Sequence, residues 1–129
     1  MTETVKTRIV VADDDLDILD LVVFKLNQAG FDTVAVTDGV AALAAIEAEP
    51  TSLAILDIMM PGLSGLDVLR NLRASEATRD LRVILLTARA RDVDVDTGFA
   101  TGANDYVIKP FSPRELLHRV NAVLARGDR

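Results

Sequence analysis

Short apolar runs alternate along this chain with segments of helical periodicity, and this alternation limits the possible folds more than any other feature. Strand-like runs that are each followed by a helix predict βα units, whose strands lie parallel because each helix crosses over the sheet. We therefore expect an α/β fold with a doubly wound, five-stranded parallel sheet. The runs expected to form its strands are residues 8–12, 33–36, 53–57, 83–87 and 105–108.

Apolar spacing and glycines place the first three helices. Gly30 is expected to end the first helix, as glycine does just past a helix. The second helix is expected at residues 40–48, and Gly65 leads into the third. The stripe that the first helix should bury is Leu19, Val22, Leu26 and Ala29.

The last helix has the clearest start. Ser112 is expected to be its N-cap, Pro113 its first residue and Glu115 the partner that closes a capping box. Residues 93–96, between the fourth and fifth strands, alternate with the period of a strand. We nevertheless expect a helix there, ending at Gly102, because parallel strands need a crossover.

Composition limits the class of protein. The chain has 129 residues, half of them apolar, which suits one domain covering residues 1–129 with an ordered core at about 7–126 and no output domain. It has no cysteine, no apolar run long enough to span a membrane and no apolar leader, so we expect a cytoplasmic protein. Its net charge is −6 without a visible basic patch, which argues against direct nucleic-acid binding and favours a divalent cation.

Polar side chains stand at the points where four of the expected strands end. In an open parallel sheet, ligands bind beyond the carboxyl ends of the strands, where the strand order reverses. Three carboxylates, a hydroxyl and an ammonium in that place predict a site for a hard cation such as Mg²⁺ and for a phosphoryl group. The residues are Asp13, Asp14, Asp57, Thr87 and Lys109.

Each of these residues also has a plainer interpretation. Asp57 is a candidate nucleophile that would form an acyl phosphate, or it is a solvated acid before a turn. Asp14 and Asp15 can simply cap the following helix. Lys109 can be a surface lysine, and Thr87 an ordinary β-branched strand residue. The set as a whole favours the functional interpretation.

Four stretches of the chain together resemble the receiver domain of two-component response regulators. The likeness spans essentially the whole chain, in order and at the spacing of the family. Within that family, the sequence looks most like receivers from winged-helix transcription regulators. The stretches are Val11-Ala-Asp-Asp-Asp-Leu-Asp-Ile18, Leu56-Asp-Ile-Met-Met-Pro-Gly-Leu-Ser-Gly65, Leu85-Leu-Thr-Ala-Arg89 and Gly102-Ala-Asn-Asp-Tyr-Val-Ile-Lys-Pro-Phe-Ser-Pro-Arg-Glu-Leu116.

The resemblance implies a flavodoxin-like (βα)5 fold with strand order 2-1-3-4-5 and a role for each site residue. Asp57 would accept a phosphoryl group from a histidine kinase or a histidine phosphotransfer protein. Asp14, Asp57 and the backbone carbonyl of Met59 would hold Mg²⁺ (or Mn²⁺), and Asp13 would act through a metal-bound water. Thr87 and Lys109 would bind the phosphoryl oxygens.

The resemblance also implies a switch and a lifetime control. Thr87 and Tyr106 would couple phosphorylation to the face made by the fourth helix, the fifth strand and the last helix, where a downstream protein or output domain binds. Tyr106 can also be plain core. Met59 and Arg89 occupy the positions that tune acyl-phosphate lifetime and predict slow hydrolysis. The bond before Pro110 would be cis.

Receivers of the winged-helix class often dimerise through charged pairs on that face. Asp105, Glu115 and Arg119 match the pattern, whereas Val95 and Ala100 depart from it on the fourth helix. Asn104 also stands where an Asp is common. The chain is therefore expected to be a monomer or a weak, phosphorylation-dependent dimer.

Other functions stay open at this stage. A pseudo-receiver that binds proteins without phosphorylation is one, although the intact set of site residues argues against it. A receiver cut from a DNA-binding transcription regulator is another. A phosphatase with an aspartate nucleophile would place a second Asp at position 59, where this chain has Met59. A flavin carrier would need a loop after the first strand that receives phosphate, and here that loop is acidic.

Overall fold

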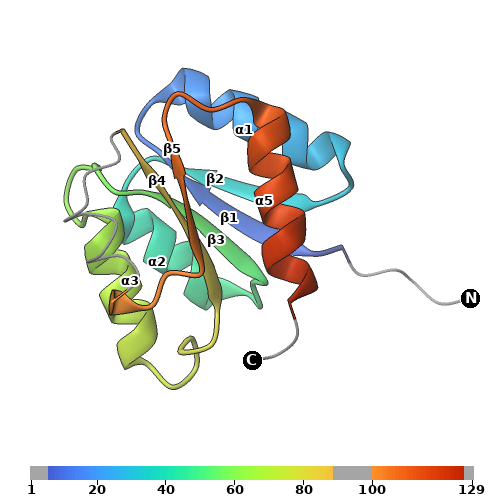
Figure 1. Ribbon diagram of the computed structural model, residues 1–129. Helices are drawn as coiled ribbons and strands as arrows, with labels where there is room; N and C mark the ends of the chain where they lie inside the picture. The colour runs from blue at the N-terminus through green and yellow to red at the C-terminus, as the bar shows by residue number, and fades with distance from the viewer. Residues whose placement is uncertain (1–5, 89–99, 127–129) are drawn as a thin grey trace, which may run out of the picture.

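The computed structural model describes residues 6–88 and 100–126 (Figure 1). All strands of its sheet are parallel and follow the order β2-β1-β3-β4-β5, which confirms the expected doubly wound topology. The strands are β1 (Arg8–Ala12), β2 (Asp32–Val36), β3 (Leu53–Asp57), β4 (Arg82–Thr87) and β5 (Asp105–Ile108). The helices among the described residues are α1 (Leu16–Gln28), α2 (Gly39–Ala48), α3 (Gly65–Ala74) and α5 (Pro113–Ala125).

Helices cover both faces of the sheet, α1 and α5 on one and α2 and α3 on the other (Figure 1). Alternate residues of β1 therefore enter different cores: Ile9 and Val11 pack with α1 and α5, and Val10 with α2 and α3. The central strand β3 is buried along its whole length, whereas the edge strand β2 is partly exposed. Continuous apolar strands are what a sheet covered on both faces requires.

The start and end of α1 follow local chemistry. Asp15 caps the helix by accepting from the backbone N–H groups of Asp17 and Ile18. Gly30 follows the helix with a φ of 99°, a conformation that glycine adopts without strain. The expected stripe holds for three of its four residues, but Ala29 is exposed. The helix ends at Gln28, so Ala29 belongs to the turn that leaves the core.

Two helices on opposite faces begin at serine caps. Ser112 accepts from the N–H of Glu115, as expected, but the hydrogen bonds found among the described residues do not include the reciprocal one that would complete a capping box. A complete capping box occurs instead at α3, between Ser64 and Asp67. The helix expected before β5 lies mostly outside the described residues, although residues 100 and 101 are helical.

Candidate functional site

Three consecutive acids follow β1 and take three different environments. Asp13 is fully buried, and its Oδ1 accepts from the N–H of Asp15 at 2.9 Å. Asp14 is exposed, and Asp15 caps α1. The capping interpretation therefore applies to Asp15 and leaves the other two carboxylates available for another role.

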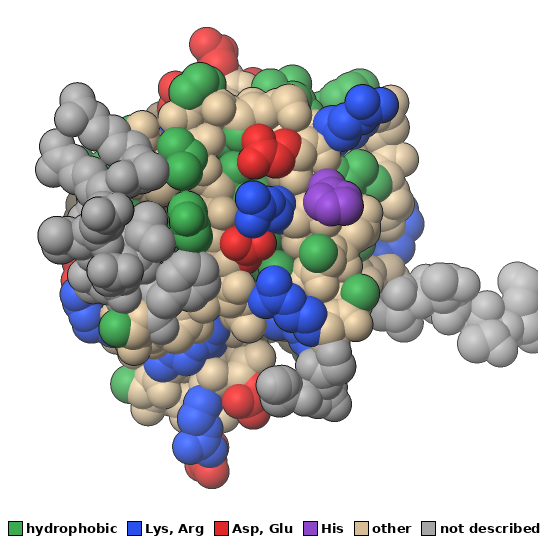
Figure 2. Space-filling model, in the orientation of Figure 1, with side chains coloured by type: hydrophobic (Ala, Val, Ile, Leu, Met, Phe, Trp, Pro, Cys, Tyr) green, Lys and Arg blue, Asp and Glu red, His purple; other side chains and the backbone are tan. Residues whose placement is uncertain are grey.

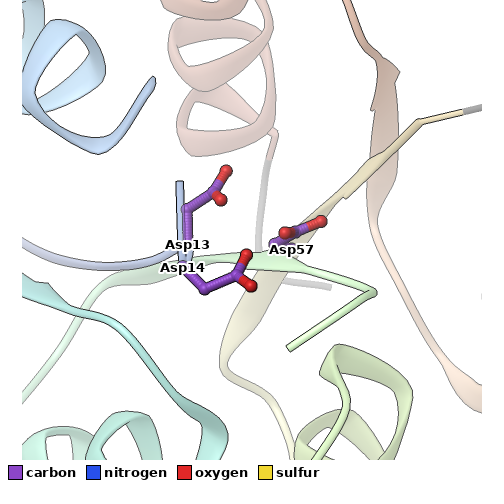
Figure 3. Close-up of side chains that lie close together, drawn as sticks. All are labelled: Asp13, Asp14 and Asp57. Atoms are coloured by element: carbon purple, nitrogen blue, oxygen red, sulfur yellow. The ribbon is translucent and has the colours of Figure 1, made fainter. Parts of the chain in front are cut away.

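Asp57, the last residue of β3, joins these acids because β1 and β3 are neighbours. Its side chain is buried, with 4% of the residue exposed, and its Oδ1 accepts from the N–H of Met59 at 3.4 Å. Figure 3 shows the side chains of Asp13, Asp14 and Asp57 converging at this edge of the sheet. One oxygen from each lies within 4.8 Å of the others, an arrangement that can hold a metal ion.

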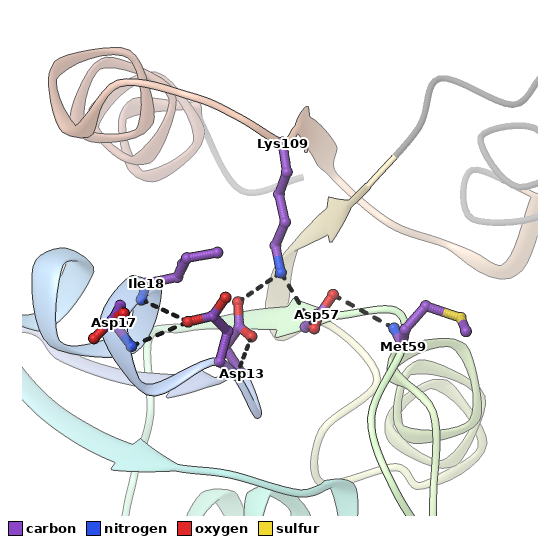
Figure 4. A network of polar contacts seen from close by, with 7 residues as sticks. Asp13, Asp17, Ile18, Asp57, Met59 and Lys109 are labelled. Carbon is purple, nitrogen blue, oxygen red and sulfur yellow. Dashed lines mark hydrogen bonds and ion pairs between the residues drawn. The ribbon is translucent and has the colours of Figure 1, made fainter.

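Lys109 enters the same cluster from the end of β5. Its Nζ lies 2.9 Å from Oδ2 of Asp13 and 3.3 Å from Oδ2 of Asp57 (Figure 4). The ion pair is the contact found for the buried Oδ2 of Asp13, which makes no hydrogen bond of ordinary geometry to the described residues. Lys109 is therefore an inward-facing lysine, and its bond to Pro110 is cis as expected.

The charges of this cluster do not balance. Among the described residues, three carboxylates face one ammonium, so full ionisation leaves an excess of two negative charges, which is the charge of one divalent cation. Burial raises the pKa of Asp57 to about 6, and the charge of Asp13 adds to this while Lys109 opposes it. Burial alone would lower the pKa of Lys109, but its close contact with the carboxylate of Asp13 and the charge of Asp57 raise it overall.

Thr87 ends β4 beside this cluster, one residue beyond Leu86, which pairs with Asp57. It is buried, and its carbonyl accepts from the N–H of Lys109 at 2.7 Å. Tyr106 lies on the neighbouring strand, half-buried, and packs against the core shared with α2 and α3. The structure thus brings Thr87 to the predicted edge, while the coupling of its side chain to that of Tyr106 stays a prediction.

The two expected lifetime positions differ in what the structure describes. Met59, two residues after Asp57, is 72% exposed and stands between the buried Ile58 and Met60. Its carbonyl stays a predicted ligand. Arg89 lies outside the described residues.

The charged residues expected to pair between two copies of the chain pair within one copy. Arg119 of α5 contacts both carboxylate oxygens of Asp105 at 3.1 and 3.2 Å and lies 3.9 Å from Glu115. Figure 2 shows alternating acidic and basic side chains on this face. Ala100 is exposed, and Val95 lies outside the described residues.

Sequence reasoning missed the role of Gly65 behind the site. A Cβ on Gly65 would overlap the carbonyl oxygen of Asp57, and its own N–H donates to the carbonyl of Ile58 at 3.0 Å. The backbone of α3 therefore approaches the backbone of Asp57 more closely than a side chain allows. A glycine at the first position of a helix was the available signal.

This fold and site define a class, and comparison with known proteins names it. The family model of the response regulator receiver domain matches residues 9–121. The chain belongs to this family. Within the described residues, no helix combines the length and the apolar character needed to cross a bilayer.

Individual relatives are consistent with membership of the receiver family. The DNA-binding response regulator MtrA of Mycobacterium tuberculosis is 42% identical over 126 residues, which cover 98% of this chain and 54% of that protein. The sensory transduction protein RegX3 of Mycobacterium bovis is 42% identical over 94% of this chain and 52% of its own length. The chain thus spans about half the length of these curated relatives.

Solved structures share the fold closely. A putative response regulator from Chloroflexus aurantiacus superimposes with a TM-score of 0.89 at 32% identity, covering 95% of this chain and 100% of that one. The chemotaxis protein CheY4 of Vibrio cholerae gives 0.88 at 26% identity, covering 92% and 99%.

Proposed function

We propose that this chain is the phosphoacceptor switch of a two-component phosphorelay, with Asp57 receiving a phosphoryl group from the phosphohistidine of a kinase or phosphotransfer protein. The observation that carries the proposal is the unbalanced cluster in which the ammonium of Lys109 lies between the carboxylates of Asp13 and buried Asp57. Membership of the receiver family supports it. The chain turns over no outside substrate, and the only reactions it promotes are its own phosphorylation and dephosphorylation.

The transfer step needs an ionised Asp57. A carboxylate oxygen of Asp57 forms a bond to phosphorus as the phosphorus–nitrogen bond to the donor histidine breaks, and the imidazole leaves. Lys109 stays protonated and binds a phosphoryl oxygen as a point charge. Thr87 donates its hydroxyl to another phosphoryl oxygen.

The residues present fit Mg²⁺ (or Mn²⁺). Asp14, Asp57 and the carbonyl of Met59 would hold the cation, and Asp13 would act through a bound water. The carboxylate oxygens and the excess negative charge are those that a hard divalent cation prefers. A bound cation would neutralise charge on the carboxylates and on the phosphoryl oxygens.

Phosphorylation would be transmitted by Thr87 and Tyr106 to the face formed by β5, α5 and the segment before β5. A protein partner or an output domain would read that face. The relative MtrA is named a DNA-binding response regulator and RegX3 a sensory transduction protein, and the name of MtrA supports control of a DNA-binding output by this receiver. The chain itself, a single domain in the cytoplasm, would bind no nucleic acid and act as a monomer or weak phosphorylation-dependent dimer.

The neighbours of the acceptor would set the lifetime of the phosphorylated state. Met59 beside Asp57, with Arg89 two positions after Thr87, would limit the approach of water to the acyl phosphate. The acyl phosphate on Asp57 should therefore hydrolyse slowly, over minutes or longer. A lifetime of seconds, measured as loss of added mass after the donor is removed, would contradict this assignment.

Intact mass after incubation with acetyl phosphate and Mg²⁺ tests the proposal. Wild type should gain one phosphoryl group and lose this ability in EDTA. Asp57→Asn should gain none, whereas Asp20→Asn, an exposed acid on α1, should behave as wild type. A phosphorylated Asp57→Asn protein would reject Asp57 as the acceptor, and an unmodified wild type would favour the pseudo-receiver.

A further inference from the structure

The loop between β3 and α3, residues 58–64, carries the predicted metal-binding carbonyl of Met59. Its first residue is fixed, since the N–H of Ile58 donates to Leu86 at 2.9 Å and its carbonyl accepts from Gly65 at 3.0 Å. Ile58 and Met60 are buried. The far part of the loop, at Leu63, rests on Gly39, the first residue of α2.

The contact between Gly39 and Leu63 leaves no space for a side chain. A Cβ on Gly39 would overlap the carbonyl oxygen of Leu63 and would lie 2.6 Å from its Cβ. Carbon atoms in contact are about 3.5 to 4.0 Å apart, so even a methyl group would force a displacement of roughly 1 Å. Gly39 is buried and does not have a positive φ, so its requirement is steric.

The displacement would fall on the loop, because α2 is anchored at both ends. Asp38 caps the start of α2 by accepting from the N–H of Ala41 at 2.8 Å. Arg8 donates to the carbonyls of Ala45 and Glu49 near its end, both at 3.1 Å. The loop has fewer restraints, with Met59, Pro61 and Gly62 exposed to solvent.

We propose that Gly39 is a positioning residue for the cation site: by letting Leu63 lie directly on α2, it sets the position of the loop that presents the Met59 carbonyl beside Asp57. The inference rests on the proposed function, because it concerns the same cation site. Gly39 touches neither the cation nor the phosphoryl group. A shift of the loop changes the distance between Met59 and the two carboxylates and so weakens the binding of Mg²⁺.

The test compares Gly39→Ala with Gly30→Ala. Gly30 has a φ of 99°, and no atom outside Gly30 and its two chain neighbours lies within 4 Å of the place that a Cβ would take, so alanine there strains the backbone at the end of α1 without touching the loop. Both variants should melt at lower temperature than wild type. Only Gly39→Ala should bind Mg²⁺ more weakly by calorimetry, by about tenfold, the usual scale for losing the support of a metal ligand.

Phosphorylation by acetyl phosphate should follow the same division. Gly39→Ala should need about tenfold more Mg²⁺ for half-maximal rate, and its rate at saturating Mg²⁺ should approach that of wild type. Equal Mg²⁺ affinity in Gly39→Ala and wild type overturns the positioning role, and so does an equal loss in Gly30→Ala.

Two further outcomes are also decisive. If Gly39→Ala is unfolded in buffer, the proteins are compared in sucrose, which favours folded states. A variant still unfolded there assigns Gly39 to folding alone and overturns the inference. A wild type that binds no Mg²⁺ would instead defeat the proposed function, which separates the two failures.

Discussion

The two ends of the sheet handle buried charge in opposite ways. At the carboxyl end, Asp13 and Asp57 share Lys109, and negative charge is left over. At the amino end, Arg119 pairs with the buried carboxylate of Asp105 at the start of β5, and Arg73 of α3 donates to the neutral carbonyl of Gly102 at 2.7 and 3.1 Å.

More bonds of this kind join the amino end. Arg73 also lies 3.3 Å from Oδ1 of Asn104, which accepts from the N–H of Val83 at 2.8 Å. Arg82 donates to the carbonyl of Arg126 at 2.9 Å, and Arg126 donates to the carbonyl of Asn104 at 3.0 Å. These bonds tie α3, α5 and the segment before β5 to the start of β4.

The carboxyl end is thus the candidate binding site, whereas the hydrogen bonds of the amino end serve stability. Unbalanced negative charge at the carboxyl end lowers the stability of the protein without a cation and would favour the binding of a cation there. Satisfied hydrogen bonds at the amino end hold the same strands together without a ligand. A carboxylate should therefore destabilise the carboxyl end and stabilise the amino end, and substitutions of basic residues at the two ends should differ in pH dependence and in their response to Mg²⁺.

Lys109→Met should give the largest effect. The substitution removes the ammonium that lies beside Asp13 and Asp57 and leaves two buried carboxylates without it, which should cost on the order of 3 kcal/mol of unfolding free energy at neutral pH. The loss should shrink towards acidic pH, as Asp57 takes a proton, and in Mg²⁺. Urea unfolding at neutral and at acidic pH, with and without Mg²⁺, measures this loss. A loss that ignores pH and Mg²⁺ would mean that Lys109 acts by packing alone.

Asp57→Asn should stabilise the protein in the absence of a divalent cation. Burial raises the pKa of Asp57 to about 6, above its ordinary value of 3.8, so the folded state binds more protons than the unfolded state within this window. Stability from this carboxyl is therefore greatest below the lower value and falls as pH rises to the upper one. The gain in Asp57→Asn should be on the order of 2 kcal/mol above the window and should vanish below it.

Thermal unfolding at a series of pH values from acidic to neutral measures this gain, with Asp20→Asn as the control. Asp20 is exposed, so its substitution removes the same charge without relieving a buried one. An Asp57→Asn protein that is less stable than wild type at neutral pH would show that Lys109 more than offsets the burial of Asp57.

Most of the fold was predictable from sequence because both faces of the sheet are buried. Continuous apolar strands are easily recognised in the sequence, and β1, β3 and β5 begin and end where they were expected. Other elements begin one residue earlier, at Asp32, Gly39 and Arg82. Pairing with neighbouring strands extends β2 and β4 to polar residues, and no apolar pattern marks them.

The two ends differ in how far sequence reveals them. The carboxyl-end residues stand at or just past the ends of apolar strands, so topology alone brings them together. The amino-end bonds join Arg73 to residues 29 and 31 positions away, and a lone arginine on a helix gives no sign of such partners. Exposure of Ala29 was equally hidden, because apolar spacing does not show where the last turn leaves the core.

Arg73→Ala should destabilise the protein by about 1.5 kcal/mol, because it removes the hydrogen bonds from a half-buried guanidinium to the carbonyl of Gly102 and to Oδ1 of Asn104. In contrast to Lys109→Met, the loss should be the same at neutral and mildly acidic pH and in Mg²⁺. Arg70→Ala, which breaks only an exposed ion pair on the same helix, should change stability far less. A Mg²⁺-dependent loss in Arg73→Ala would link the two ends of the sheet.

Asn104→Asp should have the smallest effect and the most telling sign. A carboxylate there presents the same oxygen to the N–H of Val83 and to Arg73, and charge strengthens both hydrogen bonds. The expected gain is about 0.5 kcal/mol in urea unfolding at neutral pH, lost when acid protonates the new carboxyl. Asn121→Asp, on the exposed surface of α5, adds the same charge and should give no gain.

Adding a carboxylate would then stabilise the amino end while removing one stabilises the carboxyl end. A destabilised Asn104→Asp protein would instead show that the whole acidic chain, and not its carboxyl end alone, resists further negative charge.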